Sequence, residues 1–191
     1  MIIDCHGHYT TTPPGVAAWR DAQKEAVAAD PDQISSKGVM TVSDDEIRES
    51  IETNQLRVQQ ERGTDVTVFS PRASWMGHHV GNASTSQAWT EHCNDLIRRV
   101  CDLFPTNFVP VCQLPQSPQT PIGTSITELR RCVEEMGFIG CNLNPDPSGG
   151  YWKDLPLGDK YWYPLYETMC DLDVPAMIHV SGACHPAMHT T

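Results

Sequence analysis

The sequence predicts an α/β protein with a parallel sheet, specifically a (β/α)8 TIM barrel, and three observations lead to this fold class. Strand-like apolar runs alternate with helical segments along the chain, as in repeated βα units. Each expected strand ends in polar or metal-binding side chains, which is typical of the carboxyl-terminal face of a barrel. No glycine-rich phosphate loop follows the first strand, which disfavours the alternative, an open doubly wound sheet.

The length of the chain limits how much of such a barrel it can hold. Its 191 residues suffice for one core but not for two ordinary domains and a linker, so we expect a single domain over residues 1–191. A complete barrel of this kind takes about 250 residues. Because the sequence offers only five strands, we expect it to be the N-terminal part of a longer enzyme, covering roughly the first five βα units.

Composition excludes several classes of partner. With 24 acidic and 13 basic residues the formal net charge is -11, which argues against nucleic acid and against an anionic membrane surface. The eight cysteines are scattered, without C-x-x-C spacing, and we expect buried reduced thiols. No export leader and no apolar run long enough to span a membrane is present. We therefore expect a soluble, cytoplasmic protein, and the sequence leaves a homo-oligomer open.

The first expected strand carries the strongest chemical signal. It ends in Asp4, His6 and His8, and alternate side chains of a strand point to the same face. His6 and His8 can therefore present both imidazoles to one metal ion, with Asp4 as an orienting partner. The alternative is a pair of histidines in a surface turn.

The next elements follow from local signals. Residues 9–42 form a long connection that contains a helix from Val16 to about Ala29, stopped by Asp30-Pro31. A capping box from Ser43 to Glu46 opens a second helix, which Gly63 ends. The β-branched run over residues 65–72 is the second strand.

The same βα pattern then repeats to the end of the chain. A helix over 86–104 and a strand over 108–113, ending in Gln113, come first. A helix then begins at Thr124 or Ser125, where Ser125 and Glu128 have capping-box spacing, and ends at Gly137. The remaining elements are a strand over 138–144, a Pro/Gly-rich loop over 145–150, a helix over 161–172 with Pro164 in its first turn, and a strand over 174–180.

His179, at the end of the fifth strand, is the third metal ligand that we expect. Barrel closure brings this strand end across the mouth from the first strand. Together with His6 and His8, it would make an open metal site of the kind that zinc occupies in enzymes, with catalysis centred on His179. Taken alone, His179 could equally be a hydrogen-bonded core histidine.

Several other strand-end residues are candidates for substrate binding. Ser70 and Arg72 follow the second strand, and the guanidinium of Arg72 offers a planar two-donor fork for a substrate carboxylate. The alternative for Arg72 is a salt bridge to an acidic side chain. Asn144 and Asp146 flank Pro145 in a loop that the barrel would hold over its mouth, although such residues beside proline are often only turn formers.

The remaining histidines leave more than one interpretation open. His78 and His79 lie in a Gly-rich loop after the second strand, and they either line the substrate pocket, as we expect for His79, or belong to a surface loop. His185 and His189 have the i, i+4 spacing of a helical metal clip, but exposure near a chain end is the more ordinary explanation.

Four motifs resemble the amidohydrolase superfamily, namely residues 4–8, 70–74, 142–150 and 176–180. Within it, they are similar to the branch that contains aminocarboxymuconate-semialdehyde decarboxylase, and residues 4–8 and 142–150 are most similar to its 4-oxalomesaconate hydratases. The resemblance implies a barrel of the metal-dependent hydrolase type with one Zn²⁺ ion. It also implies a histidine after strand six and an acidic residue after strand eight, neither of which lies within this sequence.

The resemblance also implies a reaction and a substrate class. In the hydratase interpretation, a zinc-dependent lyase adds water to 4-oxalomesaconate, or to its enol tautomer, and gives 4-carboxy-4-hydroxy-2-oxoadipate in the degradation of lignin-type aromatic compounds. The substrate is a small anionic di- or tricarboxylate, and Arg72 would bind a carboxylate. The alternatives are decarboxylation of an aminocarboxymuconate-semialdehyde-like substrate, and a barrel fragment without catalysis.

Overall fold

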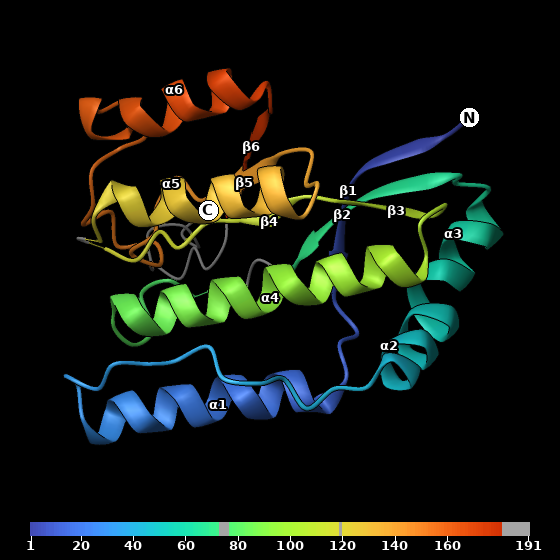
Figure 1. Cartoon of the computed structure of the whole chain (residues 1–191), viewed down its shortest axis with the longest axis horizontal. Coiled ribbons are helices and arrows are strands. Elements are labelled where there is room, and N and C mark those ends of the chain that lie inside the picture. Colours follow the sequence, from blue (N-terminus) through green and yellow to red (C-terminus); the bar gives the residue numbers. More distant parts are fainter. Residues whose placement is uncertain (73–76, 119, 181–191) are drawn as a thin grey trace, which may run out of the picture.

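The computed structural model describes residues 1–72, 77–118 and 120–180, which form a parallel sheet flanked by helices (Figure 1). The strands are β1 (Ile3–Tyr9), β2 (Val66–Pro71), β3 (Phe108–Pro110), β4 (Cys112–Gln113), β5 (Cys141–Leu143) and β6 (Ala176–Ile178). Their pairings are all parallel and give the orders β1-β2-β3 and β4-β5-β6. Parallel pairing of consecutive strands through helical connections confirms the α/β class predicted from the sequence.

β3 and β4 together are the single third strand expected over 108–113. The N–H of Val111 donates to Phe69 O in β2 at 2.9 Å, whereas the N–H of Cys112 donates to Gly140 O beside β5 at 3.0 Å. Successive residues of a strand bond alternately to its two neighbours, so the segment lies between β2 and β5. It therefore joins the two three-stranded sets into one continuous parallel sheet.

The helices fall close to the predicted positions, with two of them ending in π-helical turns. They are α1 (Pro14–Ala29), α2 (Asp44–Ile51), the π-turn η1 (Glu52–Leu56), α3 (Arg57–Arg62), α4 (Ala83–Leu103), α5 (Ile122–Arg130), the π-turn η3 (Arg131–Glu135), the 3₁₀ turn η4 (Lys160–Trp162) and α6 (Tyr163–Leu172). Pro164 lies in the first turn of α6, as expected. Among the described residues, none of these helices has both the length and the apolarity that a bilayer crossing needs.

One predicted helix start is confirmed and another is wrong. Ser43 and Glu46 form the expected capping box, and Gly63 ends α3 in the left-handed conformation at φ 69°. Ser125 and Glu128 do not form one, because α5 begins at Ile122, two or three residues before the predicted start, and Ser125 lies inside the helix. The Ser125 hydroxyl instead donates to Pro115 O at 3.1 Å, and the Glu128 carboxylate accepts bonds from Asn94 of α4 and from Arg131 in the turn η3.

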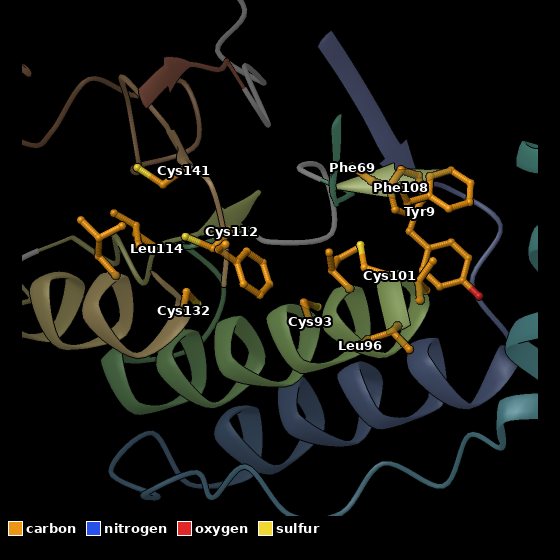
Figure 2. Packing of buried hydrophobic residues seen from close by; sticks show 14 of the residues in the cluster. Tyr9, Phe69, Cys93, Leu96, Cys101, Phe108, Cys112, Leu114, Cys132 and Cys141 are labelled. Atoms are coloured by element: carbon orange, nitrogen blue, oxygen red, sulfur yellow. The ribbon is translucent and has the colours of Figure 1, made fainter. Parts of the chain in front are cut away.

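The core lies between the sheet and helix α4, which in turn separates the sheet from α1 (Figure 1). Figure 2 shows Tyr9, Phe69 and Phe108 grouped at one end of this core, and sulfur-containing side chains along the rest of it. Five cysteines are buried and free, as expected: Cys93, Cys101, Cys112, Cys132 and Cys141. Burial raises the pKa of Cys101 and of Cys141 to about 12, so these thiols stay protonated.

The expectation of burial is wrong for two other cysteines. Cys5 and Cys170 are exposed, and both are free. Cys184 lies outside the described residues.

Candidate metal centre

Three histidine side chains meet at the carboxyl ends of β1 and β6. His6 and His8 come from β1, and His179 directly follows β6. Their ring centroids lie 4.4 to 4.9 Å apart, and one nitrogen of each ring lies within 4.8 Å of the others. β1 and β6 stand at opposite ends of the strand order, so the sheet must curve to bring these residues together.

The closest approach in this cluster joins the Nε2 atoms of His8 and His179, which lie 3.0 Å apart. Without an ion, one nitrogen donates a proton to the other. Two nitrogens bound tetrahedrally to Zn²⁺ at 2.0–2.1 Å would lie about 3.3 Å apart. The two Nε2 atoms are therefore within a few tenths of an ångström of that spacing, and a ring nitrogen of His6 lies within 4.8 Å of the ligand nitrogens of both.

The ring of His8 is oriented by groups on β2. Its Nδ1 lies 2.9 Å from the carbonyl oxygen of Pro71 and 2.9 Å from the hydroxyl of Ser70, which itself donates to Gly7 O at 3.0 Å. A carbonyl can only accept, so Nδ1 carries the proton and Nε2 keeps a free lone pair. A histidine that binds a metal through Nε2 carries its proton on Nδ1, and the group that accepts this proton is usually a backbone carbonyl or a carboxylate.

Burial keeps two of these imidazoles neutral. It lowers the pKa of His8 to about 4, against the opposing effect of the Pro71 carbonyl and with a smaller contribution from the charges of His6 and His179. Burial and the neighbouring His6 also lower the pKa of His179. Both rings are therefore neutral at neutral pH, and a metal ion binds neutral imidazole. The Nδ1 of His179 is buried without a hydrogen-bond partner in the described chain.

Asp4 and Ser70 support the cluster in different ways. The carboxylate of Asp4 accepts the backbone N–H of His6 at 3.1 Å, so it orients the strand rather than an imidazole ring. Ser70 is buried, and its hydroxyl contacts His8, so the residue predicted to bind substrate lies directly behind a candidate metal ligand.

Of the remaining candidates, Arg72 and Asn144 follow two different strands. Arg72 is exposed at the end of β2 and lines a small cavity beside Tyr9 and Trp89. Asn144 is buried after β5, and its backbone N–H and carbonyl are paired with the side chain of Gln116 at 2.8 and 3.1 Å.

Asp146 behaves as a turn former. Its Oδ1 accepts the N–H of Ser148 at 3.0 Å and also the Ser148 hydroxyl, and its Oδ2 accepts the N–H of Trp152 at 3.0 Å. Both carboxylate oxygens are thus used to fold the loop after β5. This favours the turn-forming interpretation over substrate binding for Asp146.

The two histidines after β2 have different environments. His79 is exposed and lies against Gly149 of the loop after β5. His78 is buried, with its Nδ1 3.0 Å from the Ser86 hydroxyl, and burial lowers its pKa to about 3. A plain surface loop is therefore the wrong interpretation for His78. His185 and His189 lie outside the described residues.

Two buried glutamines were not among the predicted site residues. Gln116 pairs with the backbone of Asn144, and the side chain of Gln113 donates to Pro71 O at 3.1 Å, the same carbonyl that His8 contacts. The sequence marks Gln113 only as the polar end of a strand. Its contact depends on the spatial neighbourhood of β2 and β4, which a local pattern does not contain.

Comparisons with known proteins agree with this fold. The model of the amidohydrolase family matches residues 3–191. The chain is 59% identical over 191 residues to 2-keto-4-carboxy-3-hexenedioate hydratase of Sphingobium sp. (strain NBRC 103272 / SYK-6), covering 100% of this chain and 55% of that protein. It is 28% identical over 137 residues to gamma-resorcylate decarboxylase of Polaromonas sp. (strain JS666 / ATCC BAA-500), covering 68% of this chain and 39% of that protein.

A solved structure gives the same relationship in three dimensions. The crystal structure of 4-oxalomesaconate hydratase from Rhodopseudomonas palustris matches with a TM-score of 0.85 and 50% identity, over 97% of this chain and 54% of that one. The chain thus spans about half the length of the relatives that it matches. With the family model matched over almost its entire length, the chain belongs to the amidohydrolase family.

Proposed function

We propose that this chain provides the first five βα units of a (β/α)8 barrel and the metal-binding half of its active site. The parallel strand order and the likeness to amidohydrolase structures support the barrel. The observation that carries the proposal is the convergence of His6, His8 and His179 at the carboxyl ends of strands from opposite ends of that order.

These three histidines would hold one divalent ion, and we propose zinc. Neutral imidazole nitrogens suit zinc, and a set of three protein ligands leaves a position open for water or substrate. When bound, such an ion lowers the pKa of a water molecule and polarises a substrate oxygen. Manganese is the alternative, since a crystal structure of a dihydroxybenzoic acid decarboxylase with this fold contains bound manganese.

The substrate we propose is 4-oxalomesaconate or its enol tautomer, because the relatives at 59% and 50% identity are hydratases. In the reaction, the oxygen of water bonds to one carbon of the activated double bond and a proton to the other, which gives 4-carboxy-4-hydroxy-2-oxoadipate. Arg72 would bind a carboxylate of the substrate through its planar guanidinium. Ser70, Asn144 and His79 would complete the substrate-binding wall.

We also propose a location and a class of partner for this protein. An acidic chain without a bilayer-crossing helix among its described residues suits a cytoplasmic enzyme that acts on a small carboxylate. We propose neither nucleic acid nor a membrane as a partner, and homo-oligomerisation remains compatible with this function.

The alternative reaction is decarboxylation, which the 28% identity to gamma-resorcylate decarboxylase favours. Incubating the purified full-length protein with 4-oxalomesaconate in H₂¹⁸O separates the two reactions. We expect one ¹⁸O atom in the new hydroxyl group of the product and no release of CO₂. Release of CO₂ would instead support the decarboxylase. Absence of turnover on 4-oxalomesaconate would contradict the proposed substrate.

A further inference from the structure

The carbonyl group of Pro71 lies at the junction between the metal centre and the sheet. Its oxygen accepts the Nδ1–H of His8 at 2.9 Å and the Nε2–H of Gln113 at 3.1 Å. A carbonyl oxygen has two lone pairs, so both acceptor positions are used. Gln113 is only 4% exposed, and its amide therefore acts on Pro71 in a place from which bulk water is excluded.

Gln113 is itself held on both sides of its backbone. The side chain of Asn94, on α4, accepts the N–H of Gln113 at 3.0 Å and donates to its carbonyl at 2.9 Å. The Asn94 side-chain amide thus makes the two backbone hydrogen bonds that a neighbouring strand would otherwise make with Gln113. Since Asn94 is fully buried, the backbone of Gln113 cannot shift without leaving polar groups unpaired.

The hydrogen bonds continue into the helical layer. The amide of Asn94 also donates to Glu128 of α5 at 2.7 Å, and Glu128 accepts two bonds from Arg131 at 2.8 Å. Glu128 is 3% exposed, so its charge is compensated by these donors rather than by water. A connected set of buried bonds thus runs from α5 through α4 and β4 to Pro71 and His8.

We propose that Gln113 is a positioning residue for the metal ligand His8, acting through the Pro71 carbonyl. This rests on the proposed metal centre. Donation from Gln113 fixes the direction of that carbonyl, and the carbonyl fixes the tautomer and plane of the imidazole. Without the amide, the Pro71 carbonyl is free to turn, and the lone pair of His8 Nε2 is no longer aimed at the point shared with His179.

A matched pair of glutamines allows a test. Gln59 is also buried, at 5% exposure, and its Nε2 donates to Asp65 O at 3.0 Å and Asn107 O at 3.2 Å. These carbonyls precede β2 and β3. Gln59 therefore donates to backbone carbonyls at the amino ends of the strands, whereas Gln113 donates to one at the carboxyl end of β2. Methionine at either position keeps the length of the side chain and removes the donor.

The experiment measures the Kd for Co²⁺ of the full-length protein by competition with a chelator, together with Tm and the visible spectrum of the bound Co²⁺. For Gln113→Met we expect binding about 10- to 100-fold weaker and an altered spectrum. For Gln59→Met we expect a lowered Tm but wild-type Co²⁺ affinity and spectrum. Gln113→Glu preserves shape but cannot donate when ionised, and it should weaken binding as well, which keeps the test valid if the methionine variant fails to fold.

Each outcome decides one claim. Wild-type Co²⁺ affinity and spectrum in the folded Gln113 variants would overturn the role of Gln113 and leave the metal centre intact. Equal weakening by Gln59→Met would also overturn it, because the effect would then come from general destabilisation. A wild-type protein that binds no Co²⁺ would overturn the proposed metal centre itself, and with it the role of Gln113.

Discussion

His8 shows how much of the proposed metal site depends on residues outside the three-histidine cluster. His8 and His6 are two residues apart, so strand periodicity places their side chains on the same face, and the sequence alone predicts this. The orientation of the His8 ring depends on Pro71 and Ser70, which are 63 and 62 residues away along the chain. Those contacts come from the register in which His8 pairs with Ser70, after a shift of register between Asp4 and Gly7.

Gly149 is a second residue whose role appears only in three dimensions. It has φ 77°, and a Cβ atom at this position would lie 2.6 Å from the Nδ1 of His79. Glycine is therefore required both by the backbone conformation and by the packing of the two loops that follow β2 and β5. This contact brings His79 beside the loop that carries Asn144.

Replacing this glycine should destabilise the protein. We expect Gly149→Ala to lower the free energy of unfolding by about 1–2 kcal/mol from the left-handed backbone alone, and by more because the methyl group displaces His79. Gly123→Ala, where a Cβ meets nothing within 4 Å, is the control and should be neutral or slightly stabilising. Urea denaturation measures both. Equal stability of the two variants would contradict this account, and His79→Ala should relieve part of the loss in Gly149→Ala.

At the scale of elements, local signals predict where helices occur better than they predict which polar residue caps them. Ser43 and Glu46 face solvent, so nothing competes with the capping box. Ser125 and Glu128 have the same spacing but are buried, where bonds to Pro115 and Asn94 are available instead. Tertiary contacts therefore decide which of the two Ser-x-x-Glu patterns forms a capping box, and the local sequence does not reveal these contacts.

The loop after β5 is held in shape by hydrogen bonds to the carboxylate of Asp146. Burial alone would raise the pKa of Asp146, but bonds from the Ser148 side chain and from the backbone of Trp152, Ser148 and Gly150 outweigh it and lower the pKa. A carboxyl group with a lower pKa in the folded state stabilises that state above its unfolded pKa, near 3.9. The contribution is lost as the pH falls through the folded value.

The corresponding prediction concerns pH and stability together. Asp146→Asn should lower the free energy of unfolding at pH 7, because one acceptor oxygen becomes an NH₂ donor that faces other donors. The difference from wild type should shrink below about pH 4, as the wild-type carboxylate becomes protonated. Urea denaturation at pH 7 and pH 3 measures this, with the exposed Asp171→Asn as control. A difference that grows at pH 3 would show that the charge of Asp146 does not hold the loop.

At the scale of the whole molecule, the described strands form a curved wall with one open side. β1 pairs with β2 and β6 pairs with β5, and no further strand among the described residues covers their outer edges. An open cavity of about 450 Å³ runs along the inner wall, lined by side chains that include His6, Val68 and Val111. In the proposed barrel, the additional strands would fill this side, consistent with relatives almost twice as long.

The sequence predicts the whole molecule well where the pattern repeats and poorly where distant segments meet. Alternation of strands and helices is periodic along the chain, and it gives the class and the parallel order. The meeting of His179 with His8 requires the curvature of the complete strand order, which no single segment encodes. The sequence predicts this meeting only if closure of the barrel is assumed.

The most direct test of the central claim is the metal content of the full-length protein after reconstitution with zinc and removal of unbound ions. We predict one divalent ion per chain in the wild type and a large loss in His6→Ala, His8→Ala and His179→Ala. His92→Ala should keep its metal, because this buried histidine stacks on Trp19 and lies outside the metal-ligand cluster. A wild type without metal, or variants of all three ligands that retain a full equivalent, would contradict the account.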